Sequence, residues 1–290
     1  MNLRAYQGDT TKKQALLARL RVLAEQESLA TRPLFWDGTG GSIVCSALHG
    51  DELDRWESEL GLPKWLALCV DGIANWMLDP RAGLAAGIGL LEAVPVGEDV
   101  SLVGNHFLIH LLDDPTDGLS SVCSHAEQVQ LIKRIVSLHR RCAEGGKVTR
   151  TDWVDVRKAA TALRDQAAPD SVDDAVNGAI EAATWDPLIS RTAVSDTEYQ
   201  WVLAMSEAAY RNSQSKKDDP VRLVLGQLYA KAKAEGCEKP IDVLALLAQQ
   251  RPDLSKVVKA STAFIREQPG IAWRRLEQLL LQQLRGRSWN

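Results

Sequence analysis

Residues 36–52, WDGTGGSIVCSALHGDE, hold a thiol, two serine hydroxyls and an imidazole close together in the chain. Nucleophilic catalysis needs a thiol or hydroxyl within hydrogen-bond reach of a base, and Cys45 with His49 supplies such a pair. Ser42 and Ser46 are alternative nucleophiles. On a β-strand Cys45 and His49 would share one face but lie about 13 Å apart, so contact requires a bend. The enzymatic hypothesis is a hydrolase; the structural one places Cys45 in the core.

The glycines of this stretch do not complete a nucleotide-binding motif. A P-loop requires a lysine and a hydroxyl after its second glycine, and GTGGSIVC contains no lysine. A dinucleotide fingerprint requires G-x-G-x-x-G, of which only GTGG is present. Asp37-Gly38, between two apolar runs, is instead typical of a hairpin turn. The sequence therefore predicts a small β element near residues 32–48.

Histidines and a cysteine further along the chain have the residue types of a metal site. His106 and His110 are four residues apart, so on a helix they project from one face, as two zinc ligands should. Cys123 and His125 follow and could supply further ligands. The segment lacks the glutamate of H-E-x-x-H, and its spacing matches no common zinc module. A metal-dependent enzyme that uses His106 and His110 is a second enzymatic hypothesis.

Asp71 is the single acid in residues 64–78, KWLALCVDGIANWML, which are apolar on nearly every face. An unpaired carboxylate costs several kcal/mol to bury, so Asp71 must find a partner or become protonated. Backbone amides, Arg55 or Arg81 could stabilise it. A catalytic role, with Glu92 as the other half of an acid and base pair, is the alternative.

The C-terminus combines basic and aromatic side chains. Its candidate partner-binding residues are Arg274, Arg275, Arg285, Arg287 and Trp289. Arginine and tryptophan are typical of protein interfaces, and they also bind single-stranded nucleic acid. The sequence predicts either a tail that binds a protein groove, a tail that folds back onto its own domain or, less favoured, a nucleic-acid contact.

Composition indicates a globular protein. The 290 residues are 45% hydrophobic and 25% charged, with a net charge of −4, so neither global disorder nor strong attraction to nucleic acid is expected. No window approaches the roughly 20 uninterrupted apolar residues of a membrane helix. The five cysteines are scattered without a C-x-x-C pair, which favours reduced thiols and a cytoplasmic location.

Apolar residues at helical spacing predict helices over most of the chain, beginning with residues 10–28. In the second half, Ser195-x-x-Glu198 has the pattern of a capping box at a helix start. A break is expected between the helices over 253–267 and 270–285. The polar stretch 211–220 is typical of a linker. These elements predict an N-terminal helical unit with a small β element, a middle helical segment and a C-terminal helical bundle, over residues 1–120, 121–212 and 213–290.

Residues 36–113 resemble a group of bacterial proteins of unassigned activity. In that group a Gly-rich element, a histidine, a G-[IL]-P step, an apolar helix with an acid and an A-[IV]-P-x-G step recur in this order. The matching positions here are Gly40, Gly41, His49, Gly61, Pro63, Asp71, Ala93, Pro95 and Gly97. The group can carry two cysteines where this chain has only Cys45, which weakens a thiol or metal role. The resemblance implies one structural unit and no activity.

The sequence as a whole predicts a mainly α protein, a multi-helix bundle or array. The sequence contains no complete catalytic or cofactor motif, and its charge is segregated along the chain. We therefore expect a cytoplasmic protein-interaction module, which could be a subunit of a larger bacterial assembly. A protein partner, no cofactor and no membrane are expected. The alternative is the enzyme described above.

Overall fold

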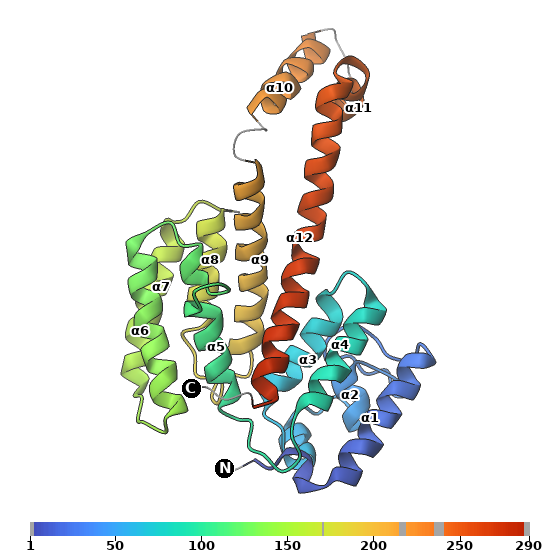
Figure 1. Ribbon diagram of the computed structural model, residues 1–290, viewed down its shortest axis with the longest axis vertical. Helices are drawn as coiled ribbons and strands as arrows, with labels where there is room; N and C mark the ends of the chain where they lie inside the picture. The colour runs from blue at the N-terminus through green and yellow to red at the C-terminus, as the bar shows by residue number, and fades with distance from the viewer. Residues whose placement is uncertain (1–2, 170, 215–218, 235–240, 287–290) are drawn as a thin grey trace. The chain divides into compact units, whose positions relative to one another are not determined.

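The computed structural model describes residues 3–169, 171–214, 219–234 and 241–286, which are mainly α-helical as predicted (Figure 1). The helices are η1 (Ala5–Gly8), α1 (Thr10–Glu25), α2 (Ile43–Leu48), η2 (Trp56–Leu60), α3 (Lys64–Trp76), α4 (Pro80–Ala93), α5 (Val103–Asp113), η3 (Leu119–Ser121), α6 (Ala126–Ala143), α7 (Arg150–Gln166), α8 (Val172–Ala182), α9 (Ala193–Gln214), α10 (Asp219–Ala234), α11 (Val243–Gln250) and α12 (Pro252–Leu284). Each helix in this part of the chain is too short or too polar to cross a bilayer.

The predicted β element near residues 32–48 is wrong. Its β-branched segment forms the helix α2, and the neighbouring backbone makes only isolated bridges, from Gly41 to Leu29 and to Trp36. Ser42 starts the helix, because its hydroxyl accepts a hydrogen bond from the amide of Cys45 at 3.2 Å. This N-cap, together with complete burial of α2, outweighs the strand preference of isoleucine and valine.

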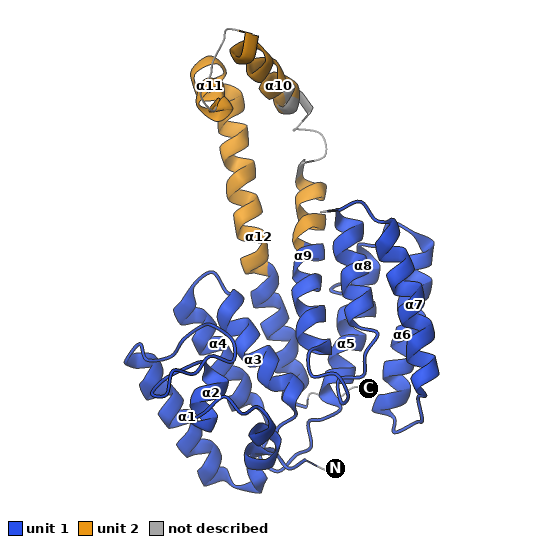
Figure 2. Ribbon diagram, turned by 180° about the vertical axis from the view of Figure 1, so that it is seen from behind, with its two compact units in different colours: residues 1–205, 272–290 blue, residues 206–271 orange. Residues whose placement is uncertain are grey.

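The chain divides into two compact units (Figure 2). The first comprises residues 1–205 and 272–290, and the second comprises residues 206–271. The first unit therefore contains the whole segment 36–113 and most of the predicted middle segment. In the second unit α10 packs against α11. That unit buries few large side chains, among them Leu228 and Leu247.

The first unit is built from helices that pack on their sequence neighbours. The pairs α3 with α4, α5 with α6 and α7 with α8 are in contact, and α1 lies against α4. Three tryptophans that are at most 1% exposed, Trp56, Trp65 and Trp201, fill its core. The Trp201 Nε1 donates to the carbonyl of Asp117 at 2.9 Å, so this indole also fixes the loop after α5. The core thereby positions the loops that are considered below.

Two details of the predicted helices are wrong. Helix α12 continues through Pro269, where a break was expected. The proline removes only one backbone hydrogen bond of this long helix, so the helix can continue past it. The predicted capping box Ser195-x-x-Glu198 is absent, because α9 already begins at Ala193. The Ser195 hydroxyl donates to the carbonyl of Thr192 at 3.2 Å, and Glu198 lies in the core at 1% exposure.

Candidate functional site

His49 and Cys45 lie at the end and in the middle of α2. His49 is the C-cap, in the left-handed conformation with φ at 50°. The Arg19 Nη1 donates to the His49 Nε2 at 2.5 Å, and its Nη2 donates to the carbonyls of Ser46 and Ala47 at 3.2 and 2.8 Å. Because a guanidinium only donates, the Nε2 accepts and the imidazole proton lies on Nδ1. The His49 Nε2 is thus occupied as an acceptor, and Arg19 caps the carbonyl end of α2.

The Cys45 thiol has the properties of a core side chain. It is 1% exposed, and burial raises its pKa, which disfavours the thiolate that a nucleophile requires. The described contacts give it no activating base. They support the structural hypothesis more than the hydrolase.

Asp71 joins α3 to the glycine-rich segment and to α2. Its Oδ2 accepts from the amide of Leu34 at 2.9 Å, and its Oδ1 accepts from the amide of Val44 at 3.1 Å. Burial raises the pKa of Asp71 to about 6, while hydrogen bonds from Ser42 and from these amides oppose the rise. The carboxylate therefore caps α2 beside Ser42 and holds the preceding loop.

The glycines in this loop serve backbone packing. A Cβ on Gly41 would lie 2.2 Å from the carbonyl oxygen of Phe35, so only glycine fits there. The same carbonyl accepts from the amide of Ser42 at 2.9 Å, and the Gly41 carbonyl accepts from the amide of Ala30 at 2.9 Å. The segment is a tightly packed support for α2.

The cluster that could hold a metal ion contains His110 and two aspartates that the sequence did not suggest, and it does not contain His106. Donor atoms of His110, Asp114 and Asp117 all lie within 4.8 Å of one another, a spacing at which they could hold a metal ion. The predicted further ligands lie apart from this cluster. The Cys123 thiol donates to the carbonyl of Leu119 at 3.3 Å, and His125 lies 3.6 Å from Asp173.

The cluster at His110 is already balanced by a cation. Arg275 donates to both carboxylate oxygens of Asp117, at 3.0 and 2.5 Å. One oxygen of Asp114 accepts from the amides of Thr116 and Asp117, at 2.8 and 2.9 Å. A metal ion would have to displace the Arg275 guanidinium, so the geometry favours a clamp between α12 and the loop after α5.

The predicted C-terminal binding residues separate. Arg275 is part of this clamp, whereas Arg274 and Arg285 are exposed. Arg287 and Trp289 lie outside the described residues. Arg275 therefore joins α12 to the loop after α5 within the first unit.

A buried acid that sequence analysis placed at a helix start lies beside a buried thiol. The Cys69 thiol hydrogen-bonds to Glu198, and burial raises the pKa of Glu198 to about 8. Oε1 of Glu198 has no hydrogen-bond partner in the described part of the chain. Because both side chains are buried, they affect the stability of the fold and not the binding of a ligand.

The loop between α8 and α9 exposes three large apolar side chains close together in the chain. Trp185, Leu188 and Ile189 are 41%, 53% and 77% exposed. Asp186 braces the loop, because its Oδ1 accepts from the amide of Leu188 at 3.0 Å and its carbonyl accepts from the amide of Ile189 at 2.9 Å. Large apolar side chains that lie together on a protein surface are typical of binding sites.

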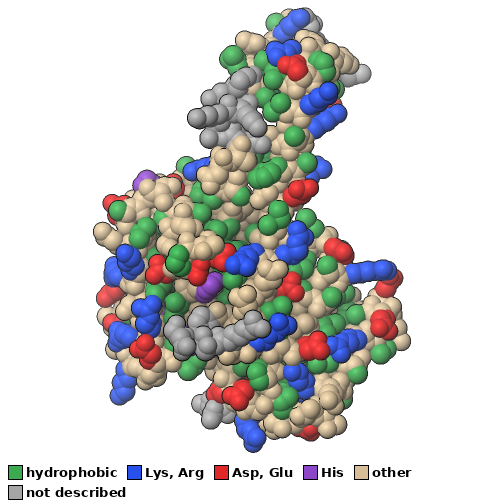
Figure 3. All heavy atoms as spheres, in the orientation of Figure 1, with side chains coloured by type: hydrophobic (Ala, Val, Ile, Leu, Met, Phe, Trp, Pro, Cys, Tyr) green, Lys and Arg blue, Asp and Glu red, His purple; other side chains and the backbone are tan. Residues whose placement is uncertain are grey.

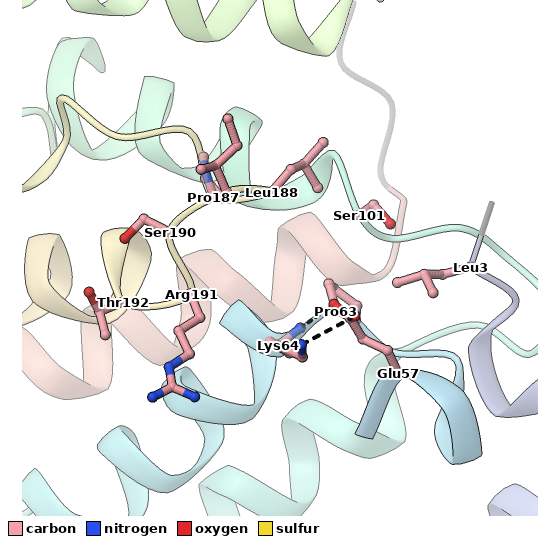
Figure 4. A pocket seen from close by; sticks show the side chains of 11 residues that line it. Leu3, Glu57, Pro63, Lys64, Ser101, Pro187, Leu188, Ser190, Arg191 and Thr192 are labelled. Carbon is pink, nitrogen blue, oxygen red and sulfur yellow. Dashed lines mark hydrogen bonds and ion pairs between the residues drawn. The ribbon is translucent and has the colours of Figure 1, made fainter. Parts of the chain in front are cut away.

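Three hollows adjoin this loop. The first, of about 630 Å³, places Pro187 and Leu188 across from Pro63 and Lys64 (Figure 4). A second, of about 850 Å³, is lined by aromatic rings that include Trp76, Tyr199 and Trp185. A third, of about 310 Å³, is lined by Trp185 and Ile189 together with residues of α7. The loop side chains therefore stand beside space that a partner's side chains could fill.

Arg157 and Trp185 line both the second and the third hollow, so their stacked side chains separate the two. The Arg157 guanidinium lies over the indole, 3.1 Å from its centroid, and donates to the hydroxyl and carbonyl oxygens of Thr184 at 3.4 and 3.1 Å. This stack holds Trp185 in place even though its ring is partly exposed.

Sequence analysis did not single out this loop, because tryptophan is usually buried. The available signal was the segment WDPLI, residues 185–189, in which large apolar residues surround a proline between two helices. The chain was compared with protein-family models, with curated proteins and with solved structures, and none of the three comparisons gave a match.

Proposed function

We propose that this protein is a cytoplasmic, helical protein-interaction module, and that the α8–α9 loop, residues 183–192, is the centre of its binding face. The observation that carries the proposal is the exposure of Trp185, Leu188 and Ile189 on a loop whose backbone is hydrogen-bonded to Asp186. Such hydrogen bonds reduce the conformational entropy that a loop loses on binding, and a central tryptophan is typical of interface hot spots.

Two further features support an interaction role. The hollows beside the loop could accept side chains of a partner, as hot-spot pockets do. The described cysteines are free thiols, which suits a reducing compartment. A place in a larger bacterial assembly would follow if the partner is itself a subunit of one.

Site-specific photocrosslinking tests the proposal. A photoreactive phenylalanine analogue is placed at Ile189, and at Val22 on α1 as a control. Val22 is also an exposed aliphatic residue, at 49%, but lies far from the loop in sequence. We expect a discrete crosslinked product in cells from position 189 alone.

The partner protein in that product is then identified and purified. Its binding to the wild type, to Ile189→Asp and to Val22→Asp is measured by titration. Binding should weaken by about tenfold or more in Ile189→Asp and stay unchanged in Val22→Asp. If no product forms at position 189, or if Ile189→Asp binds as well as the wild type, the loop is not the binding face.

A further inference from the structure

The helical hairpin beside the α8–α9 loop is strongly basic. Residues 133–158, from the middle of α6 to the middle of α7, contain eight lysines and arginines against three acids, a net charge of +5 in a chain whose net charge is −4. Most of these cations are exposed, among them Arg140, Lys147 and Arg150. The hairpin contacts the loop directly, because the Cys142 thiol at the end of α6 lies 3.8 Å from Asp186.

Two arginines of α7 line the third hollow without a carboxylate partner. Arg150 and Arg157 both lie at its edge with Trp185 and Ile189. Neither lies within salt-bridge distance of an acid in the described part of the chain. The nearby Glu181, whose charge acts on Arg157, pairs with Arg164 at 2.7 Å. Asp186, which also lines the hollow, is engaged by the amide of Leu188 and by the Cys142 thiol.

The hollow keeps a net positive charge next to apolar surface, because its two arginines outnumber its one acid, Asp186. Burial lowers the pKa of Arg157 and the charge of Arg150 lowers it further, against the opposing charge of Glu181, so the two guanidinium groups repel each other. A carboxylate placed between them would relieve this repulsion and could accept hydrogen bonds from both.

We propose that the partner bound by the α8–α9 loop is a protein segment in which acidic residues flank large apolar ones. Its apolar side chains pack on Leu188 and Ile189, and its carboxylates pair with Arg150 and Arg157. This inference rests on the proposed function and adds the chemistry of the partner to it.

Single-stranded nucleic acid fits the same charge less well. Base stacking needs an open aromatic face, and the guanidinium of Arg157 covers one face of Trp185. The most exposed side chains of the loop, Leu188 and Ile189, are aliphatic and offer no ring for a base. The apolar part of the surface therefore favours a polypeptide.

Peptide binding to the full-length protein tests the inference. The probes are a fluorescent peptide Ser-Glu-Glu-Ile-Leu-Glu-Glu-Ser, the same peptide with glutamine for glutamate, the same peptide with serine for Ile-Leu, and an oligothymidylate of similar length. The proteins are the wild type, Arg150→Glu, Ile189→Asp and the charge-matched control Arg81→Glu, in which the replaced arginine is 85% exposed and distant in sequence. Circular dichroism checks that each variant is folded.

The inference predicts that the acidic, apolar peptide binds best and that its affinity falls with salt. Arg150→Glu should weaken its binding by about tenfold or more, because one attractive contact becomes repulsive, whereas Arg81→Glu should not. Ile189→Asp should weaken it as well.

Other outcomes overturn the inference in distinguishable ways. If the glutamine peptide binds equally well and only Ile189→Asp weakens it, the apolar docking face stands and the acidic partner is wrong. Tighter binding of the oligothymidylate would identify nucleic acid as the ligand. If no peptide binds at about 1 mM, the acidic partner is also wrong, while the crosslinking at Ile189 decides the proposed function separately.

Discussion

The Asp71 carboxylate accepts a hydrogen bond from the amide of Val44 at 3.1 Å, and this contact ties the core helix α3 to the first turn of α2. The second oxygen of the carboxylate binds the amide of Leu34 at 2.9 Å, on the other side of the glycine-rich segment. One buried side chain therefore fixes two stretches of backbone that are separated by the tight turn at Gly41.

Replacement of Asp71 by alanine should destabilise the protein strongly. The change leaves two amides without an acceptor in a site where Asp71 itself is 1% exposed. Each buried unsatisfied amide costs about 1–3 kcal/mol, so we expect a loss of roughly 3 kcal/mol or more in the free energy of unfolding. Urea denaturation followed by circular dichroism measures it.

The exposed acid Glu52 provides the control for this measurement. Glu52→Ala should change the free energy of unfolding by less than about 0.5 kcal/mol. Equal stability of the Asp71→Ala and Glu52→Ala proteins would show that Asp71 does not hold the loop.

The sequence predicted that Asp71 needs a partner but could not choose among the candidates. Both candidate arginines pair with other acids, Arg55 with Glu59 at 2.6 Å and Arg81 with Glu27 at 2.5 Å. Backbone amides become the partners only because the glycine-rich segment folds over α3, a long-range contact that local patterns do not encode. The same limit explains the wrong β element, since the helix α2 depends on this capping contact.

The Cys45 thiol should be unreactive in the folded protein, with or without His49. Its burial keeps alkylating reagents out and raises its pKa, and the His49 Nε2 is occupied by Arg19. Iodoacetamide labelling, read by mass spectrometry at the peptide that contains Cys45, should be equally slow in the wild type and in His49→Ala. Labelling in urea should be fast in both and serves as the control. A marked loss of labelling in folded His49→Ala would revive the hydrolase hypothesis.

The clamp at Asp117 predicts how the His110 cluster responds to metal ions. Arg275→Gln frees both Asp117 oxygens and removes a positive charge beside them, so zinc should bind this variant more tightly than the wild type, by about tenfold or more. Isothermal titration calorimetry measures both affinities. The neighbouring exposed Arg274→Gln provides the same charge change without breaking the clamp and should behave as the wild type. Tighter zinc binding by the wild type than by Arg275→Gln would mean that the arginine does not compete with metal.

Sequence patterns predicted most helices of the chain, because apolar spacing reports which face is buried. They failed at Glu198, where a serine followed three residues later by a glutamate has the form of a capping box. The pattern specifies residue types and spacing but not where the helix begins, and α9 already begins at Ala193, before Ser195. They also did not single out Trp185, since tryptophan is usually buried and only the tertiary structure shows which rings remain exposed.

The buried Glu198 predicts a stability that falls as pH rises. Its pKa is about 8 in the folded protein and near its ordinary value of 4.5 in the unfolded chain, so between these values the folded state holds a proton that the unfolded state has released. Raising the pH from 5 to 9 should therefore lower the free energy of unfolding progressively, up to the point where Glu198 ionises in the fold. Asp71, whose pKa is about 6 in the folded protein, also lowers the free energy of unfolding as the pH rises towards 6. Urea midpoints across this range measure the effect.

Glu198→Gln isolates the contribution of this carboxyl group, because the amide has a similar shape and does not titrate. The variant should lose less stability than the wild type between pH 6 and 9, whereas the exposed Glu127→Gln should follow the wild type. The difference between the wild-type and Glu198→Gln curves then gives the cost of ionising a carboxyl group whose Oε1 lacks a hydrogen-bond partner among the described residues. Parallel curves for the two proteins would mean that Glu198 keeps an ordinary pKa in the fold, and that the core around Cys69 admits water.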